Sequence, residues 1–173
     1  MSSAEPWLFA LALLAALGSG LVAGVFFAFS TFVMKALARI PAGAGIAAMQ
    51  SINVVVLGPW FMAAFLGTGV ACVLVLIGSL TRWNEPGSTC LLVGAMLYLA
   101  GTLFVTVAFN VPMNDALRKI SPTDPDGARL WARYVPGWTV WNHVRTAAAL
   151  AAAASFTLAL AQIGSGFVWT GDL

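Results

Sequence analysis

The chain has 173 residues, of which 61% are hydrophobic and 8% are charged, and its formal net charge is +2. Because a water-soluble domain needs roughly a quarter of its residues charged, this composition excludes a soluble protein and indicates an integral membrane protein. The small net charge and the lack of a Lys/Arg-rich run exclude nucleic acid as a partner. The lipid bilayer is therefore the expected environment.

Four stretches are long and apolar enough to cross a bilayer as helices, which takes about 20 residues. They cover residues 7–33, 54–80, 88–109 and 142–163. We therefore expect an all-α fold in which residues 1–173 form a single domain, a bundle of four transmembrane helices. The first stretch has no basic residue before it and a longer apolar run than a signal peptide, so we interpret it as a transmembrane helix.

Small residues recur every four positions in the first stretch, at Ala12, Ala16, Gly20, Gly24 and Ala28. Such a stripe predicts that another helix approaches closely. Cys72 and Cys90 form no C-x-x-C pair, so we expect them to be apolar packing residues. The sequence leaves the oligomeric state open, and a homo-oligomer is one arrangement that it allows.

The basic residues of the connections predict the orientation of the bundle. Connections 34–53 and 110–141 carry most of the cations, whereas the short turn at 81–87 carries only Arg82. Since Lys and Arg collect in cytoplasmic loops, we expect both long connections in the cytoplasm and both termini outside. We expect the membrane to be the bacterial inner (plasma) membrane, with the polar connections on its cytoplasmic side.

The two halves of the chain are similar at an offset of eighty residues, where 25–40 aligns with 105–120. Some matches in so apolar a chain arise by chance, so the sequence leaves open whether two tandem helical hairpins arose by duplication. The polar groups lie in the second copy, where Asn110 and Asn114 stand opposite Ser30 and Met34. This difference suggests that the second half is the specialised one.

Residues 110–146 concentrate the amides, indoles and cations of the chain, together with its single histidine. Pro112 predicts that the third helix kinks or stops near Asn110, because proline removes a backbone donor and disfavours helix in the residue before it. Asn110 and Asn114 lie four residues apart and therefore on one side of the chain. They either satisfy the freed carbonyl groups of a polar helix end or face a cavity and donate to a ligand oxygen.

Pro136 suits the first turn of the fourth helix. From there one helix face carries Trp138, Trp141, Asn142 and Arg145. His143 falls on another side, so a mechanism that uses it with that face needs an irregular helix start. The tryptophans can instead be interfacial anchors, Arg145 can extend to the headgroups, and His143 can be structural. Polar groups crowded at membrane depth nevertheless favour a functional site.

Metal chemistry is poorly supported by the sequence. One histidine, two separated cysteines and no acidic residue inside a span predict no metal or haem site. Serine-hydrolase and phosphate-loop motifs are absent. Transport is disfavoured too, because no acidic residue inside a span can couple ions.

Several ordered motifs link the chain to a known family. They are GVFFAFSTFVMKAL at 24–37, FNVPMND at 109–115, Trp131, Tyr134 and WTVWNHVRT at 138–146. Over residues 15–160 the chain resembles the anthrone-oxygenase-like family of small four-helix membrane proteins. The resemblance implies oxidation of an anthrone-type or other lipophilic phenolic to a quinone by O₂ as co-substrate, with no metal or flavin cofactor.

The resemblance also implies roles for individual residues. His143 is expected to be the base, with Asn142 and Arg145 stabilising an enolate or peroxide. Asn110 and Asn114 are expected to orient the substrate, and Trp138 and Trp141 to stack against it, after it arrives sideways from the lipid. The alternative is a non-catalytic bundle that binds a lipophilic ligand or a partner membrane complex through the same face.

Overall fold

The computed structural model describes residues 6–168, and the side chains among them up to residue 164. The described chain is helical from end to end, with short turns between helices and no strand. The elements are α1 (Pro6–Ala28), η1 (Phe29–Val33), α2 (Met34–Leu37), α3 (Ala42–Val55), α4 (Pro59–Thr81), α5 (Ser88–Met96), η2 (Leu97–Phe104), η3 (Thr106–Asn110), α6 (Val111–Arg118) and α7 (Gly127–Val168), where η marks a π-helical segment.

Within residues 6–168, four continuous helices are long and apolar enough to cross a membrane, which confirms the predicted four-helix membrane architecture. They cover Pro6–Leu37, Pro59–Thr81, Ser88–Arg118 and Gly127–Gly164. α4 has 23 residues and so a length of about 34 Å, close to the roughly 30 Å of a hydrocarbon core. Trp60 and Trp83 lie exposed near its two ends, where interfacial tryptophans are common.

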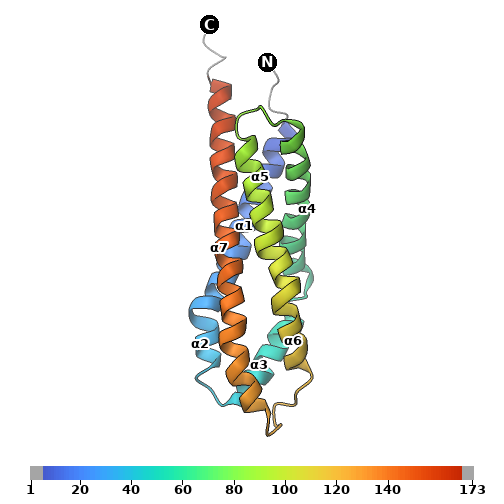
Figure 1. The fold of residues 1–173 in the computed structure, drawn as a ribbon, viewed down its shortest axis with the longest axis vertical. Helices are drawn as coiled ribbons and strands as arrows, with labels where there is room; N and C mark the ends of the chain where they lie inside the picture. The colour runs from blue at the N-terminus through green and yellow to red at the C-terminus, as the bar shows by residue number, and fades with distance from the viewer. Residues whose placement is uncertain (1–5, 169–173) are drawn as a thin grey trace.

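α7 is much longer than a membrane requires. It has 42 residues, a length of about 63 Å, and its first turns extend past the beginning of α4 together with α2, α3 and α6 (Figure 1). We call this extension, formed by residues 34–55 and 111–138, the cap. The long connection predicted at 110–141 is therefore mostly helix, and Pro136 lies inside α7 instead of in its first turn.

The third span does not stop near Asn110, so that alternative of the prediction is wrong. Helix continues from η3 directly into α6, and Pro112 stands in the first turn of α6. Just before it, the backbone N–H of Val111 donates to the carbonyl of Thr106, one residue further back than in an α-helix. This wider turn lets the chain remain helical beside a proline.

Two hydrophobic cores follow one another along the molecule. The membrane core includes Phe26, Phe65, Tyr98 and Phe156 and lies among α1, α4, α5 with η2, and α7. The cap core consists of Met34, Ile46, Met49, Leu117, Trp131, Tyr134 and Trp138. The cap is also closed by hydrogen bonds, because Gln50 Nε2 donates to the carbonyl oxygens of Leu117 and Ile120 at 2.9 Å each.

The predicted stripe of small residues is buried only at its start. Ala12 is fully buried, whereas Gly24 is exposed. The other buried positions of α1 lie outside the stripe, at Leu8, Ala15, Ser19, Val22, Ala23 and Phe26. A four-residue step overshoots one helical turn by about 40°. Five residues at that spacing therefore drift by about 160° around the helix, away from the packed face.

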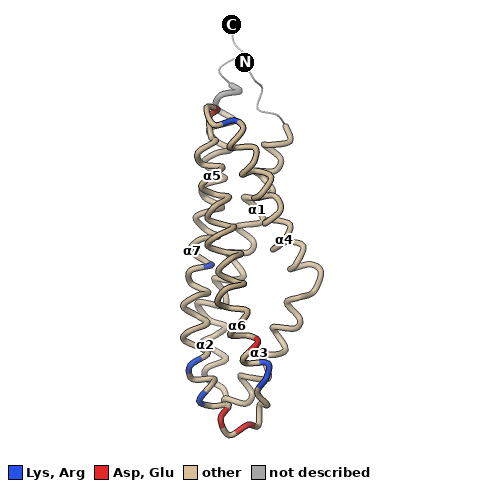
Figure 2. The backbone as a smooth tube through the Cα atoms, turned by 45° about the vertical axis from the view of Figure 1, so that its right-hand side comes forward, with Lys and Arg blue, Asp and Glu red and all other residues tan. Residues whose placement is uncertain are grey.

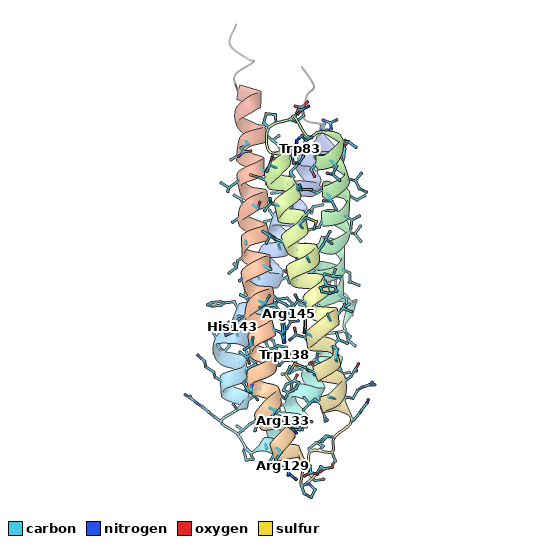
Figure 3. The ribbon with its side chains drawn as sticks, viewed as in Figure 1. Trp83, Arg129, Arg133, Trp138, His143 and Arg145 are labelled. Atoms are coloured by element: carbon cyan, nitrogen blue, oxygen red, sulfur yellow. The ribbon has the colours of Figure 1, made fainter. Side chains whose placement is uncertain are left out.

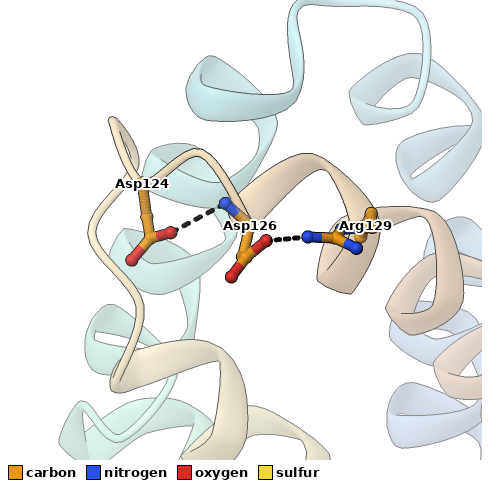
Figure 4. A network of polar contacts seen from close by, with 3 residues as sticks. All are labelled: Asp124, Asp126 and Arg129. Carbon is orange, nitrogen blue, oxygen red and sulfur yellow. Dashed lines mark hydrogen bonds and ion pairs between the residues drawn. The ribbon is translucent and has the colours of Figure 1, made fainter.

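Charged residues gather at the cap end of the molecule (Figure 2). The cap and its loops contain Lys35, Arg39, Arg118, Lys119, Arg129 and Arg133. Beyond the cap, Arg82 is the C-cap of α4, at the end of that helix away from the cap, and Arg145 lies on α7 within the bundle (Figure 3). The turn that leads into α7 is held by the backbone N–H of Asp126, which donates to Asp124 at 2.8 Å, and by the ion pair of Asp126 with Arg129 (Figure 4).

Candidate functional site

Arg145 lies where the two cores meet. Its side chain is 4% exposed and turns into the bundle from α7, just above Trp138 (Figure 3). The guanidinium carbon is 4.2 Å from the ring centre of Phe26 in the membrane core and 5.1 Å from that of Trp138 in the cap core. The two rings offer cation–π stabilisation, so one buried cation contacts both cores.

The hydrogen bonds of Arg145 leave part of its capacity unused. One terminal nitrogen donates to Asn142 Oδ1 at 2.6 Å and the other to Thr106 Oγ1 at 3.2 Å. Its Nε–H is buried without a partner, and no carboxylate among the described residues pairs with it. Since a guanidinium has five N–H donors and a buried charge is costly unless it is paired, this cation is suited to an oxygen of a guest molecule.

Asn142 holds Arg145 in position. Its amide nitrogen donates to the carbonyl oxygen of Phe26 at 2.6 Å and to Ser30 Oγ at 2.7 Å. A carbonyl can only accept, so the nitrogen must point toward α1 and Oδ1 must point toward Arg145. The first span thereby fixes the orientation of a residue far away in the chain.

Asn110 is the second polar group with unused capacity. It is 1% exposed, and its amide nitrogen donates to the carbonyl oxygen of Trp138 at 3.3 Å. Its Oδ1 is buried without a hydrogen-bond partner. Thr106, which accepts from Arg145, lies one helical turn before Asn110. The unpaired acceptor and the unpaired donor therefore belong to one cluster.

Two residues of this cluster lie in π-helical turns. Met34 N–H donates to the carbonyl of Phe29 in η1, and Val111 N–H to that of Thr106 in η3. Ser30 lies in the first of these turns, and Asn110 lies in the second. π-Turns inside α-helices occur frequently at functional sites, because they widen the helix and redirect side chains.

A stacked aromatic pair lies beside the cluster. The rings of Phe109 and Trp141 are nearly parallel, at 10°, with centres 3.6 Å apart. Both side chains are half-buried. Phe109 precedes Asn110, and Trp141 precedes Arg145 by one turn, so this partly exposed pair is adjacent in sequence to the polar cluster.

Comparison with known proteins identifies the family. A family model described as anthrone oxygenase matches residues 57–155, which is more than half of the chain. The chain belongs to the anthrone oxygenase family. No curated protein and no solved structure matched it.

The segment that matches the anthrone oxygenase family contains most of the cluster, namely Thr106, Asn110, Asn142 and Arg145. Phe26 and Ser30 lie outside it, on the first span. Both stand in the motif at 24–37, but neither was predicted to belong to the site, because an apolar span contains many phenylalanines and serines. Only the packing of α1 on α7 shows that these two side chains complete the surroundings of Arg145.

The structure brings together Asn110, Trp138, Asn142 and Arg145 of the site predicted from the sequence. Asn114 lies in the cap and is connected to the cluster through Trp138. Its Oδ1 accepts from Trp138 Nε1 at 2.9 Å and from Tyr134 Oη at 2.8 Å. His143 is exposed and lies on the outer side of α7, away from Arg145 (Figure 3). This agrees with the helical projection, which separated it from the shared face.

Two other kinds of candidate site in this member of the anthrone oxygenase family, surface pockets and metal-ligand clusters, are less well supported. A surface hollow lies at the turn Thr81–Glu85, at the end of the bundle opposite the cap and far from the cluster. Among residues 6–168 no three His, Cys, Asp or Glu side chains are grouped as metal ligands would be. The cluster around Arg145 is therefore the candidate site.

Proposed function

We propose that the protein is a membrane-embedded oxygenase that oxidises an anthrone-like or other lipophilic phenolic substrate with O₂. The observation that carries the proposal is the buried guanidinium of Arg145, which has a free Nε–H and no carboxylate partner in the part of the chain that the structure describes. Such a group stabilises an oxygen that becomes negative during reaction, and it does so most strongly away from water. Membership of the anthrone oxygenase family supports the choice of reaction.

The proposed reaction needs an oxygen anion at one point. Loss of a proton from the ring CH₂ group gives an enolate, whose oxygen accepts hydrogen bonds from Arg145. The enolate carbon passes electrons to O₂ and forms a C–O bond, which gives a peroxide. The peroxide takes up a proton and expels water, leaving a second carbonyl group. One O₂ is consumed and one H₂O is released, and we propose no cofactor besides O₂.

The proposed route to the site runs through the lipid-facing side of the bundle. Phe109 and Trp141 form a flat stack that a planar aromatic substrate can replace ring for ring. Separation of the two rings exposes the polar groups behind them to a substrate dissolved in the membrane. The rings of Trp138 and Phe26 against the guanidinium then shield it from water, which preserves the strength of its interaction with an anion.

Arg145 holds the oxygen of the substrate, so another group has to take the proton. We propose His143, the base that the family resemblance implies; from the outer face of α7 (Figure 3) it can serve only a substrate whose CH₂ group remains on the lipid side. We also propose that the cap lies in the cytoplasm of a bacterial cell, because most Lys and Arg are in the cap and its loops and such residues collect on the cytoplasmic side.

The decisive experiment measures quinone formation by the purified protein in lipid nanodiscs. An anthrone is added under air, and both quinone absorbance and O₂ consumption are recorded. The matched variants are Arg145→Lys, which keeps the charge but loses the planar fork of donors, and Arg133→Lys on the exposed side of the cap. We expect Arg145→Lys to lower the rate at least tenfold and Arg133→Lys to leave it unchanged.

The outcomes separate the two classes of function. Equal rates for wild type, both variants and empty nanodiscs would reject oxygenase activity on that substrate. Saturable binding of the anthrone without O₂ consumption would instead assign the cluster to a non-catalytic binding protein. Circular dichroism of each variant verifies that the helices remain folded.

A further inference from the structure

The two unpaired groups of the cluster have opposite hydrogen-bonding character. Arg145 Nε–H can only donate, and Asn110 Oδ1 can only accept. They could satisfy each other if they were in contact, yet both remain buried without a partner. A buried polar atom without a partner costs free energy comparable to a lost hydrogen bond. A guest that supplies both an acceptor and a donor would remove both costs.

The orientation of Asn110 follows from chemistry. Its amide nitrogen faces the carbonyl oxygen of Trp138 at 3.3 Å. A flipped amide would set two acceptors against each other, so the oxygen must be the free end. The free oxygen can only accept, so a ligand has to donate to it. Donation by the second amide N–H of Asn110 to a ligand oxygen, the role expected from the sequence, stays a prediction.

We infer that the site recognises a free hydroxyl group on its aromatic ligand, which donates to Asn110 Oδ1 while a ligand oxygen accepts from Arg145 Nε–H. This inference rests on the proposed function for the aromatic class of the ligand. It adds a rule of selection: a phenol binds, and its methyl ether, which has an acceptor oxygen but no O–H, binds less well. Asn110 is thus a specificity-determining residue.

The two groups act on the same ligand because they share neighbours. Trp138 contributes its carbonyl to Asn110 and its ring to one face of the guanidinium. Thr106 bonds to Arg145 and stands one turn from Asn110. An apolar substituent in place of the hydroxyl would leave Asn110 Oδ1 unpaired, and sites built to bond a hydroxyl discriminate strongly against ligands that lack it.

The test is equilibrium binding without O₂, so it requires no turnover. The probes are 2-naphthol and 2-methoxynaphthalene, and empty nanodiscs provide the correction for partition into lipid. For wild type we expect the dissociation constant of the ether to exceed that of the naphthol about 3- to 10-fold, the range that one hydrogen bond provides. Equal affinities in wild type would overturn the inference, whatever the variants do.

Two variants localise the preference. Asn110→Leu removes the acceptor with little change of volume, and the ratio of the two dissociation constants should fall to about one. Thr157→Val is the matched control, because it changes an exposed threonine of α7 outside the cluster and leaves Asn110 and Arg145 intact, and the ratio should persist. An undiminished ratio in folded Asn110→Leu would show that another group reads the hydroxyl and would overturn the assignment.

The failures of the two proposals are distinguishable. A hydroxyl preference without anthrone oxidation would reject the oxygenase and leave the selection rule in place. Oxidation of an anthrone together with equal binding of naphthol and ether would leave the oxygenase in place and reject the selection rule.

Discussion

Replacement of Asn142 tests whether this amide is what secures the buried cation. The variant Asn142→Leu preserves side-chain volume but removes three hydrogen bonds: those to the Phe26 carbonyl, to Ser30 and from Arg145. Hydrogen bonds between transmembrane helices contribute about 0.6 kcal/mol each on average. A bond to a charged group contributes about 2 kcal/mol. The expected loss in the free energy of unfolding is therefore about 3 kcal/mol.

The larger part of this loss should depend on Arg145 being charged and buried. The second variant, Arg145→Met, removes the cation and keeps an apolar side chain of similar length. In the double variant no buried cation lacks its partner, and buried ionic groups replaced by apolar ones of similar volume often leave stability unchanged. We therefore expect the double variant to be at least about 2 kcal/mol more stable than the sum of the two single effects.

The assay is reversible unfolding of the protein in mixed micelles by increasing fractions of SDS, followed by circular dichroism and tryptophan fluorescence. Four proteins complete the cycle: wild type, the two single variants and the double variant. Additive effects within about 0.5 kcal/mol would refute the reasoning, because they would mean that Asn142 and Arg145 do not stabilise each other. A loss below about 1 kcal/mol in Asn142→Leu alone would refute the assigned hydrogen bonds.

Three further predictions concern packing, the imidazole and access to the site. Gly101→Ala should destabilise the protein by about 1–3 kcal/mol, because a Cβ there would lie 2.4 Å from the Cβ of Ala148, whereas Gly24→Ala, with no atom within 4 Å, should be neutral in the same unfolding assay; equal effects would contradict the packing. His143→Ala should lower the rate of quinone formation tenfold or more, because it removes the proposed proton acceptor, and a rate within about threefold of wild type would exclude His143 as the base. Trp141→Ala should speed the association of 2-naphthol at least about threefold in stopped-flow fluorescence by removing half of the aromatic stack, and an unchanged rate would exclude this route.

The architecture could be predicted from the sequence because hydropathy acts over whole segments. Each span contains about 20 apolar residues, and no loop of this chain imitates that signal. The ends of the helices were less predictable. α7 includes Pro136 and begins at Gly127, because Trp131 and Tyr134 are buried in the cap core. That core also needs residues of α3, and the hydropathy pattern does not show that α3 packs against α7.

The sequence was sufficient to predict which residues of α7 belong to the site, but not which residues of the other helices contact them. Helical periodicity correctly set Trp138, Asn142 and Arg145 on one face and His143 on another. It could not decide whether Arg145 extends to the headgroups or turns inward, because that depends on Ser30 and Phe26. The π-turns that shift Ser30 and Asn110 into position leave no recognised mark in the sequence.

The double contact of Arg145 has a mechanical consequence. One ring against the guanidinium belongs to the membrane core and the other belongs to the cap core. A ligand that displaced either ring from Arg145 would remove one of these two contacts and so weaken the packing between the membrane core and the cap core. Binding of a ligand beside the membrane core would then speed amide exchange in the cap. Conversely, a more stable cap would slow the entry of a ligand.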